Sequence, residues 1–353
     1  MNTSFYVGTY ADANQESILR LEADFTHGTF RKTLSCSGIT NPSYLLPHPN
    51  GRILYAVQEL NPDGKLTAFA IEGDQLKPLV TLPTRGADPC HLSLDATGHF
   101  LAAANYTSGS LALFRLDEAG VPLEMSDFIQ QSGRGQNPVR QEGPHVHFSC
   151  EHNGIFYVVN LGVDQVFRYR LDPAAGKLSP LGSIHLPDGN GPRHLCFHPQ
   201  MPYILYVLCE LSSRIFVYRV DAAGIASMLQ SISALPEDFT GTSIAAAVKM
   251  TPDGRTLFAS NRGHDSAAVF SAGPDGRLTL VQICPTGGRA PRDITLFQNT
   301  HTDGSAAGDF LVAANQDSSR LTVLRLDAAE QKLAPTGQAW DCIGRPVCIQ
   351  PER

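Results

Sequence analysis

Short runs of alternating apolar and polar residues recur along the chain, and turn sequences separate them. The runs Val166–Leu171 and Ile215–Val220 follow the period of two that is typical of a half-buried β-strand. Each run is too short and too rich in β-branched or aromatic residues to form a stable helix. Pro252-Asp253-Gly254 is one of the turn signals that separate such runs. The pattern therefore predicts an all-β protein.

One unit repeats along the whole sequence. In each copy a Pro or a small residue opens a short apolar strand, a turn follows, and a second strand ends near an Asn. The copies start at Pro42, Pro89, Pro144, Pro192, Ala245, Pro291 and Pro346. Consecutive starts are on average about 51 residues apart, which is a suitable length for a four-stranded propeller blade.

The two ends of the chain each carry part of a copy. Pro346–Ile349 has no partner strand before Arg353, whereas Phe5–Tyr10 resembles a second strand that lacks a first. Pairing the ends completes one blade and leaves few exposed sheet edges. We therefore predict a seven-bladed β-propeller, residues 1–353 in one domain, closed by pairing of the N-terminal and C-terminal strands in one blade.

Two segments, 122–143 and 225–243, depart from the repeat because they are rich in Gly, Gln, Ser, Pro and Thr. We expect them to be long connections between blades. Within the first, Ser132–Pro138 is interpreted as a surface excursion, and a position over the mouth of a site is the alternative.

Chemistry-bearing residues cluster at equivalent positions of the repeats. In an antiparallel pair the start of strand one lies beside the end of strand two, so residues there share one face. A residue type that recurs at the same position in every repeat serves the scaffold. Charged or ionisable residues that occupy such a position in only some repeats are therefore candidates for a functional site. The candidates are His91, His145, Arg193, Glu210, Arg262, Arg292 and Gln316. For any single His or Arg a structural role is the alternative, and their joint placement favours a site.

Other polar residues recur in several repeats and are interpreted as scaffold. Asn residues end the second strand, and Asp residues occupy the tight turn that follows. These residues are Asn105, Asn160, Asn261, Asn315, Asp164, Asp265 and Asp317.

The candidate residues indicate an anionic ligand. Arginine binds carboxylate or phosphate through a planar, permanently charged fork, and a His beside a carboxylate can act as an acid or a base near neutral pH. Several arginines would also repel a divalent cation, so we expect no metal. Motifs for nucleotide or dinucleotide cofactors are missing, so we expect no cofactor.

Composition narrows the class of protein. The 353 residues are 42% hydrophobic and 17% charged, with 31 Gly and 24 Pro, as in a turn-rich globular chain. The net charge of −7 disfavours nucleic acid and anionic lipid as partners. A membrane span and a signal segment are not evident, and the eight Cys form no Cys-x-x-Cys pair, so we expect a cytoplasmic protein with reduced thiols.

Several longer motifs resemble a known family. They are Gly143–His147 (Gly-Pro-His-Val-His), Gly191–Leu195 (Gly-Pro-Arg-His-Leu), Glu210–Ser213, Ser260–Asp265 (Ser-Asn-Arg-Gly-His-Asp) and Ala314–Asp317. The sequence resembles the lactonase family of seven-bladed propellers over nearly its whole length. That family includes propeller-type 6-phosphogluconolactonases and the fungal carboxymuconate lactonising enzyme.

The resemblance implies an active site at one mouth of the propeller channel. Its catalytic residues would be His145, Arg193, Glu210 and Arg262, and we place the other candidates, His91, Arg292 and Gln316, in a surrounding substrate shell. The Ala245-Ala246-Ala247 start of the fifth repeat departs from the pattern by offering no polar side chain.

The function expected from this resemblance is hydrolysis of a phosphorylated sugar lactone in the pentose phosphate pathway, without a metal. His145 would activate water, Arg193 or Arg262 would stabilise the oxyanion, and Glu210 would orient His145 or the water. Cyclisation of a carboxymuconate is one alternative, and a non-catalytic propeller that binds anions or partner proteins is another. The oligomeric state stays open.

Overall fold

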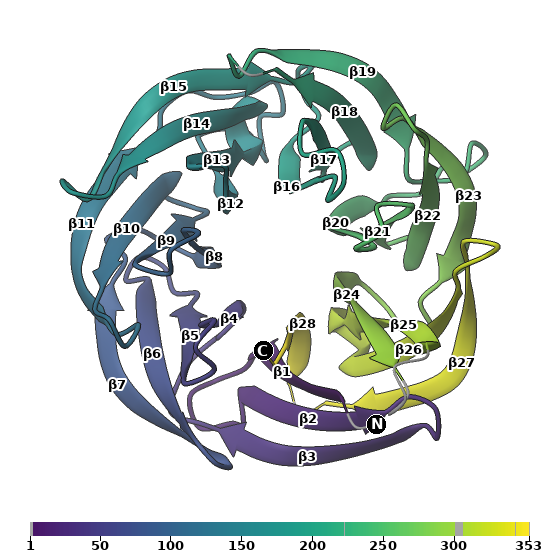
Figure 1. Cartoon of the computed structure of the whole chain (residues 1–353), viewed down its shortest axis with the longest axis horizontal. Helices are drawn as coiled ribbons and strands as arrows, with labels where there is room; N and C mark the ends of the chain where they lie inside the picture. Colours follow the sequence, from purple (N-terminus) through teal and green to yellow (C-terminus); the bar gives the residue numbers. More distant parts are fainter. Residues whose placement is uncertain (1–2, 222, 301–305, 343, 353) are drawn as a thin grey trace. The chain divides into compact units, whose positions relative to one another are not determined.

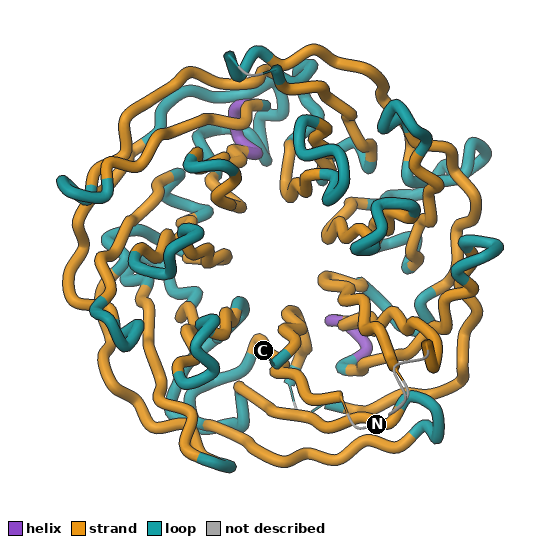
Figure 2. Tube along the Cα trace, in the orientation of Figure 1, coloured by secondary structure: helices purple, strands orange, loops and turns teal. Residues whose placement is uncertain are grey.

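The structure is a computed structural model that describes residues 3–221, 223–300, 306–342 and 344–352. Within these residues, the strands form seven four-stranded sheets. The helical segments among them are two single turns of 3-10 helix, η1 (Leu161–Val163) and η2 (Gln316–Ser318). Figure 2 shows strands joined by loops and turns, with helix confined to these short segments. The all-β prediction is confirmed.

The chain divides into two compact units. The first unit comprises Tyr6–Arg20, Thr33–Pro192 and Gln350–Arg353, and it contains three sheets with the strand orders β4-β5-β6-β7, β11-β10-β9-β8 and β12-β13-β14-β15. The bounds of these strands are β4 Leu45–Pro47, β5 Ile53–Gln58, β6 Lys65–Glu72, β7 Gln75–Pro83, β8 Pro89–Leu94, β9 Phe100–Asn105, β10 Ser110–Leu116, β11 Pro122–Gln130, β12 Val146–His152, β13 Ile155–Asn160, β14 Gln165–Asp172 and β15 Lys177–His185.

The second unit comprises Met1–Phe5, Leu21–Lys32 and Arg193–Ile349. Its three sheets have the orders β16-β17-β18-β19, β20-β21-β22-β23 and β24-β25-β26-β27. The bounds are β16 Pro192–Phe197, β17 Ile204–Cys209, β18 Arg214–Val220, β19 Ala226–Ser233, β20 Ile244–Met250, β21 Thr256–Arg262, β22 Ser266–Ala272, β23 Leu278–Pro285, β24 Pro291–Thr300, β25 Ala306–Asn315, β26 Arg320–Asp327 and β27 Lys332–Asp341.

The seventh sheet joins the two ends of the sequence. Its order is β28-β1-β2-β3, formed by β28 (Arg345–Pro351), β1 (Thr3–Tyr10), β2 (Ile18–Asp24) and β3 (Thr29–Cys36), and Figure 1 shows β28 beside β1. The predicted pairing of the N-terminal and C-terminal strands in one sheet is confirmed.

Register places the start of each first strand beside the end of the second. Pro89 pairs with Asn105 in one sheet, and Pro291 pairs with Asn315 in another. In both sheets the register shifts directly after the Pro, as a β-bulge does, before pairing resumes at His91 and at Asp293. A bulge changes the direction in which nearby side chains point. The variable polar residues that follow therefore lie at one end of the first two strands of these sheets, as the repeat pattern indicated.

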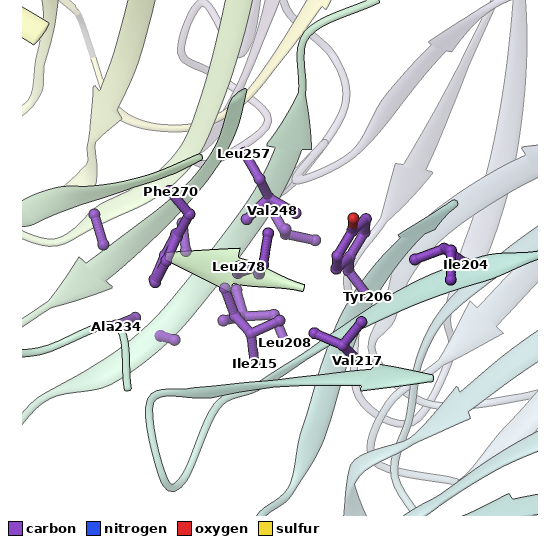
Figure 3. Close-up of a cluster of buried hydrophobic side chains, with 13 residues drawn as sticks. Ile204, Tyr206, Leu208, Ile215, Val217, Ala234, Val248, Leu257, Phe270 and Leu278 are labelled. Carbon is purple, nitrogen blue, oxygen red and sulfur yellow. The ribbon is translucent and has the colours of Figure 1, made fainter. Parts of the chain in front are cut away.

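The inner strands are apolar on both faces because neighbouring sheets cover them. Every residue of β17 is buried, and its Ile204, Tyr206 and Leu208 pack with Val248 and Phe270 of the next sheet (Figure 3). Burying one such side chain contributes about 1.5–3 kcal/mol to the free energy of unfolding.

The expectation that 122–143 and 225–243 are connections is wrong in part. The first half of each segment is the fourth, outer strand of a sheet, β11 and β19. These strands are only partly buried and have bulges in their pairing with β10 and β18. Because one face contacts solvent, their sequences lack the apolar run that identifies an inner strand.

The four recurring Asn residues and two of the three Asp residues form scaffold, as predicted, whereas Asp317 is exposed in η2 and Ser319 takes the left-handed conformation there. The four Asn side chains are fully buried. Asn160 Oδ1 accepts a hydrogen bond from the Gly162 amide at 3.0 Å, and Asn261 Nδ2 donates to the Ala234 carbonyl at 2.7 Å. Asp164 and Asp265 adopt left-handed backbone conformations in the predicted turns.

All eight cysteines are free thiols, and four of them are buried. The two described helices are single turns, so none of the described helices could cross a membrane.

Candidate active site

Three of the predicted catalytic residues contact one another in the second unit. Arg193 is the second residue of β16, Glu210 follows the end of β17, and Arg262 is the last residue of β21. The strand pairing explains the contact. In each sheet the first strand starts where the second strand ends, so these residues lie at the same end of their sheets. The Ala245 amide of β20 also donates to the Glu210 carbonyl at 3.1 Å, so the backbone connects the two sheets at this point.

One carboxylate oxygen bridges the two guanidinium groups. Oε2 of Glu210 lies 2.9 Å from Nε of Arg193 and 2.7 Å from Nη2 of Arg262. The three side chains are only 3–11% exposed. Two cations share one anion, so the three-residue cluster carries net positive charge in a poorly solvated place. Such a cluster favours an additional anionic group.

The alanines that start β20 contribute to this cluster through their backbone. Nη1 of Arg193 donates to the Ala246 carbonyl at 2.6 Å, and Nη2 of Arg262 donates to the Ala245 carbonyl at 3.1 Å. Both alanines are fully buried. The departure from the repeat pattern at this position therefore gives the arginines room to reach main-chain acceptors.

Asp293 is a buried acid that the sequence analysis did not include among the site residues. It is the third residue of β24, and its carboxylate accepts hydrogen bonds from the amides of Ile349 at 2.8 Å and Ile294 at 3.0 Å. Burial raises the pKa of Asp293, and the charges of Lys249 and Arg193 oppose that rise. The sequence did offer one indication of this residue, because Asp293 occupies the same position in its repeat as His91 does in another.

His145 lies in the first unit, directly before β12. Its Nδ1 is 3.1 Å from the Tyr106 carbonyl oxygen, and its Nε2 is 3.1 Å from Oε1 of Glu142. The ring stacks on the Tyr106 ring at a centroid distance of 4.6 Å. A carbonyl oxygen only accepts, so Nδ1 carries a proton, and Nε2 is the nitrogen that faces a carboxylate.

The sequence analysis missed Glu142. It lies in the loop between β11 and β12, three residues before His145, and its side chain is 56% exposed. The pKa of Glu142 is lowered, first by the hydrogen bond from its own backbone amide and then by the hydrogen bond with His145, against an opposing effect of burial. Only the spacing of the two residues, in a segment interpreted as a connection, could have indicated this pair.

Comparison with known proteins identifies the family. The family model described as "Lactonase, 7-bladed beta-propeller" matches residues 4–351. The chain belongs to this lactonase family. The predicted seven-bladed β-propeller fold and the family resemblance are confirmed.

Several relatives are similar to this lactonase-family chain over nearly its whole length. A 6-phosphogluconolactonase of Bacillus subtilis is 34% identical over 98% of this chain and 97% of its own. A crystal structure of a protein from Lactobacillus plantarum has a TM-score of 0.90 at 29% identity and covers 100% of both chains. A periplasmic gluconolactonase of Pseudomonas aeruginosa has a TM-score of 0.89 at 27% identity, covering 100% of this chain and 99% of the other.

The predicted substrate-shell residues of this lactonase-family chain have different surroundings. His91 is buried in the first unit between the rings of Tyr44 and Phe148, at centroid distances of 4.2 and 4.1 Å. Arg292 and Gln316 lie at one edge of a sheet in the second unit, because the neighbouring Pro291 and Asn315 pair. Among the described residues, no group of three or more His, Cys, Asp or Glu could hold a metal ion.

Proposed function

We propose that this protein is a metal-independent lactonase that hydrolyses 6-phosphogluconolactone in the pentose phosphate pathway. The cluster of Arg193, Glu210 and Arg262 is the main support, because two buried guanidinium groups on one carboxylate favour an anionic centre. The Bacillus subtilis relative is named for this reaction.

In the proposed reaction, the oxygen of a water molecule attacks the lactone carbonyl carbon and a proton of that water passes to the unprotonated Nε2 of His145. Arg193 or Arg262 stabilises the oxyanion that forms. The bond from the carbonyl carbon to the ring oxygen then breaks, and the proton on His145 moves to that ring oxygen. The carboxylic acid product ionises, so each turnover releases one proton.

The 6-phosphate is assigned to the remaining candidate residues. Arg292 would bind it through charge-assisted hydrogen bonds, with Gln316 and His91 contributing to the substrate shell. Hydrolysis of an unphosphorylated gluconolactone is the second candidate, because the Pseudomonas aeruginosa neighbour is named a gluconolactonase. That neighbour is also named periplasmic, and the cytoplasmic location of this chain stays a prediction.

The test is the initial rate of lactone loss, corrected for spontaneous hydrolysis, with 6-phosphogluconolactone and with gluconolactone, in the presence and absence of a chelator. We expect chelator-insensitive turnover with a higher kcat/KM for the phosphorylated lactone. A higher kcat/KM for gluconolactone would favour the second candidate. Failure with both lactones and with carboxymuconate would contradict an enzymatic role and favour a propeller that only binds anions.

A further inference from the structure

His145 has little direct access to solvent in the first unit. Its side chain is only 6% exposed, Nδ1 faces the Tyr106 carbonyl, and the Tyr106 ring covers one face of the imidazole. Nε2 faces Glu142, whose side chain is 56% exposed. A proton on Nε2 therefore has a carboxylate next to it that also contacts bulk water.

The loop that carries Glu142 is held from inside by its neighbour. Gln141 is fully buried, and its Nε2 donates to the Leu161 carbonyl at 2.9 Å and to Asp164 Oδ2 at 2.8 Å. Its Oε1 accepts the Asn137 amide at 3.1 Å. A Cβ at Gly135 would lie 2.5 Å from the Gln141 side chain, so a larger residue there would have to displace that side chain. These contacts fix Glu142 beside His145 although Glu142 itself is exposed.

Hydrogen bonds and nearby charges together favour the ionised form of Glu142. Its pKa is lowered by hydrogen bonds and, to a smaller extent, by the charge of Arg140, two residues earlier. Arg140 Nη2 also contacts the Tyr106 hydroxyl at 3.1 Å, so the stacked pair of Tyr106 and His145 has Arg140 on the tyrosine and Glu142 on the histidine. An ionised carboxylate that contacts solvent can accept a proton and return it to water within one turnover.

We infer that Glu142 relays the proton of each turnover from Nε2 of His145 to solvent. The inference rests on the proposed lactone hydrolysis, in which the carboxylic acid product ionises and releases one proton. In the relay, that acid gives its proton to Nε2 of His145. The N–H bond at Nε2 then breaks, an O–H bond forms on the Glu142 carboxylate, and that proton leaves to water. Glu142 is a positioning residue in this scheme, since it acts through His145.

The variants Glu142→Gln, Glu142→Asp and Glu142→Ala separate proton relay from orientation of the ring. Gln keeps a hydrogen-bonding group but cannot take up a proton, so relay predicts that kcat falls about tenfold in dilute buffer with KM unchanged. Small proton-accepting buffers at high concentration should restore kcat in the Gln and Ala variants. The Glu142→Asp variant should keep most of the activity, because it retains a carboxylate that can take up a proton. Glu124→Gln, an exposed carboxylate on the outer strand β11, is the matched control and should behave as wild type.

Two kinetic results would overturn the inference. One is a wild-type kcat for Glu142→Gln in dilute buffer. The other is a loss of activity that added buffer does not restore, because that result would show that Glu142 only orients the ring.

A second readout does not need turnover. In protein labelled with nitrogen-15 at histidine, exchange of the His145 ring proton with solvent should slow about tenfold in Glu142→Gln, because its nearest proton acceptor is gone. Unchanged exchange would contradict the relay even if no lactone is hydrolysed. Slowed exchange without any lactone turnover would instead contradict the proposed function while retaining the proton path.

Discussion

Arg193 and Glu210 form an ion pair that is almost entirely shielded from water, with 2.9 Å between Nε and Oε2 and with side chains that are 3% and 4% exposed. Arg262 contacts the same carboxylate oxygen. Desolvation makes such a pair expensive to form, and removing one partner is more costly still because a buried charge is then left uncompensated. The cluster is therefore sensitive to any change at Glu210, in stability as well as in activity.

Replacing Glu210 with Gln should lower the free energy of unfolding by about 3 kcal/mol and abolish lactone turnover. The substitution removes the charge that two guanidinium groups share. Urea unfolding and initial rates are the measurements. Asp341→Asn is the control, since the Arg320–Asp341 pair is exposed, and it should change neither quantity. Near-wild-type stability of Glu210→Gln would show that the buried charges do not depend on this carboxylate.

Replacing Arg292 with Ala should raise the KM for 6-phosphogluconolactone about tenfold and leave the KM for gluconolactone unchanged. The reason is that a guanidinium is assigned to the phosphate, which only the first substrate has. Steady-state kinetics with both substrates tests this assignment. Equal effects on both KM values would place Arg292 outside the phosphate contact.

Replacing Asp293 with Asn should destabilise the protein less at pH 7 than at pH 5. Burial raises the folded-state pKa of Asp293 above its unfolded value, so the folded protein binds the extra proton more tightly. The contribution of Asp293 to stability is therefore present at low pH and decreases as pH rises through the folded pKa. Urea unfolding of both proteins at the two pH values measures the difference, and a penalty that grows with pH would contradict this sign.

Replacing Gln141 with Ala should cost about 2 kcal/mol and loosen the loop that follows β11, because buried polar groups lose their partners. Limited proteolysis should then cut within residues 132–143, where we expect the wild-type protein to resist cleavage. Gln136→Ala is the control, because the Gln136 side chain is exposed in the same loop. Cleavage at the same rate in all three proteins would show that Gln141 does not hold the loop.

The sequence predicted those parts of the molecule that repeat. The Pro that starts a first strand and the Asn that ends a second strand recur, and pairs such as Pro89 with Asn105 then place the variable residues at one edge. The outer strands β11 and β19 were not predicted, because they are only partly buried and their sequences contain no continuous apolar run.

The contacts of His145 could not be predicted for a different reason. The position of Glu142 depends on how Gln141 packs against Leu161 and Asp164, which are about 20 residues further along the chain. A local pattern does not contain that information. The role of Asp293 could not be predicted for a related reason, since it depends on the Ile349 amide of a distant strand.

The sheet that contains both β1 and β28 constrains how the protein is made. A nascent chain leaves the ribosome with β1 first and β28 last, so β1 has an open hydrogen-bonding edge throughout synthesis. An open edge is a template for pairing with other chains. Translation that stops before Arg345 would leave β1 without its partner strand, so an unfinished copy would be prone to aggregate through that edge.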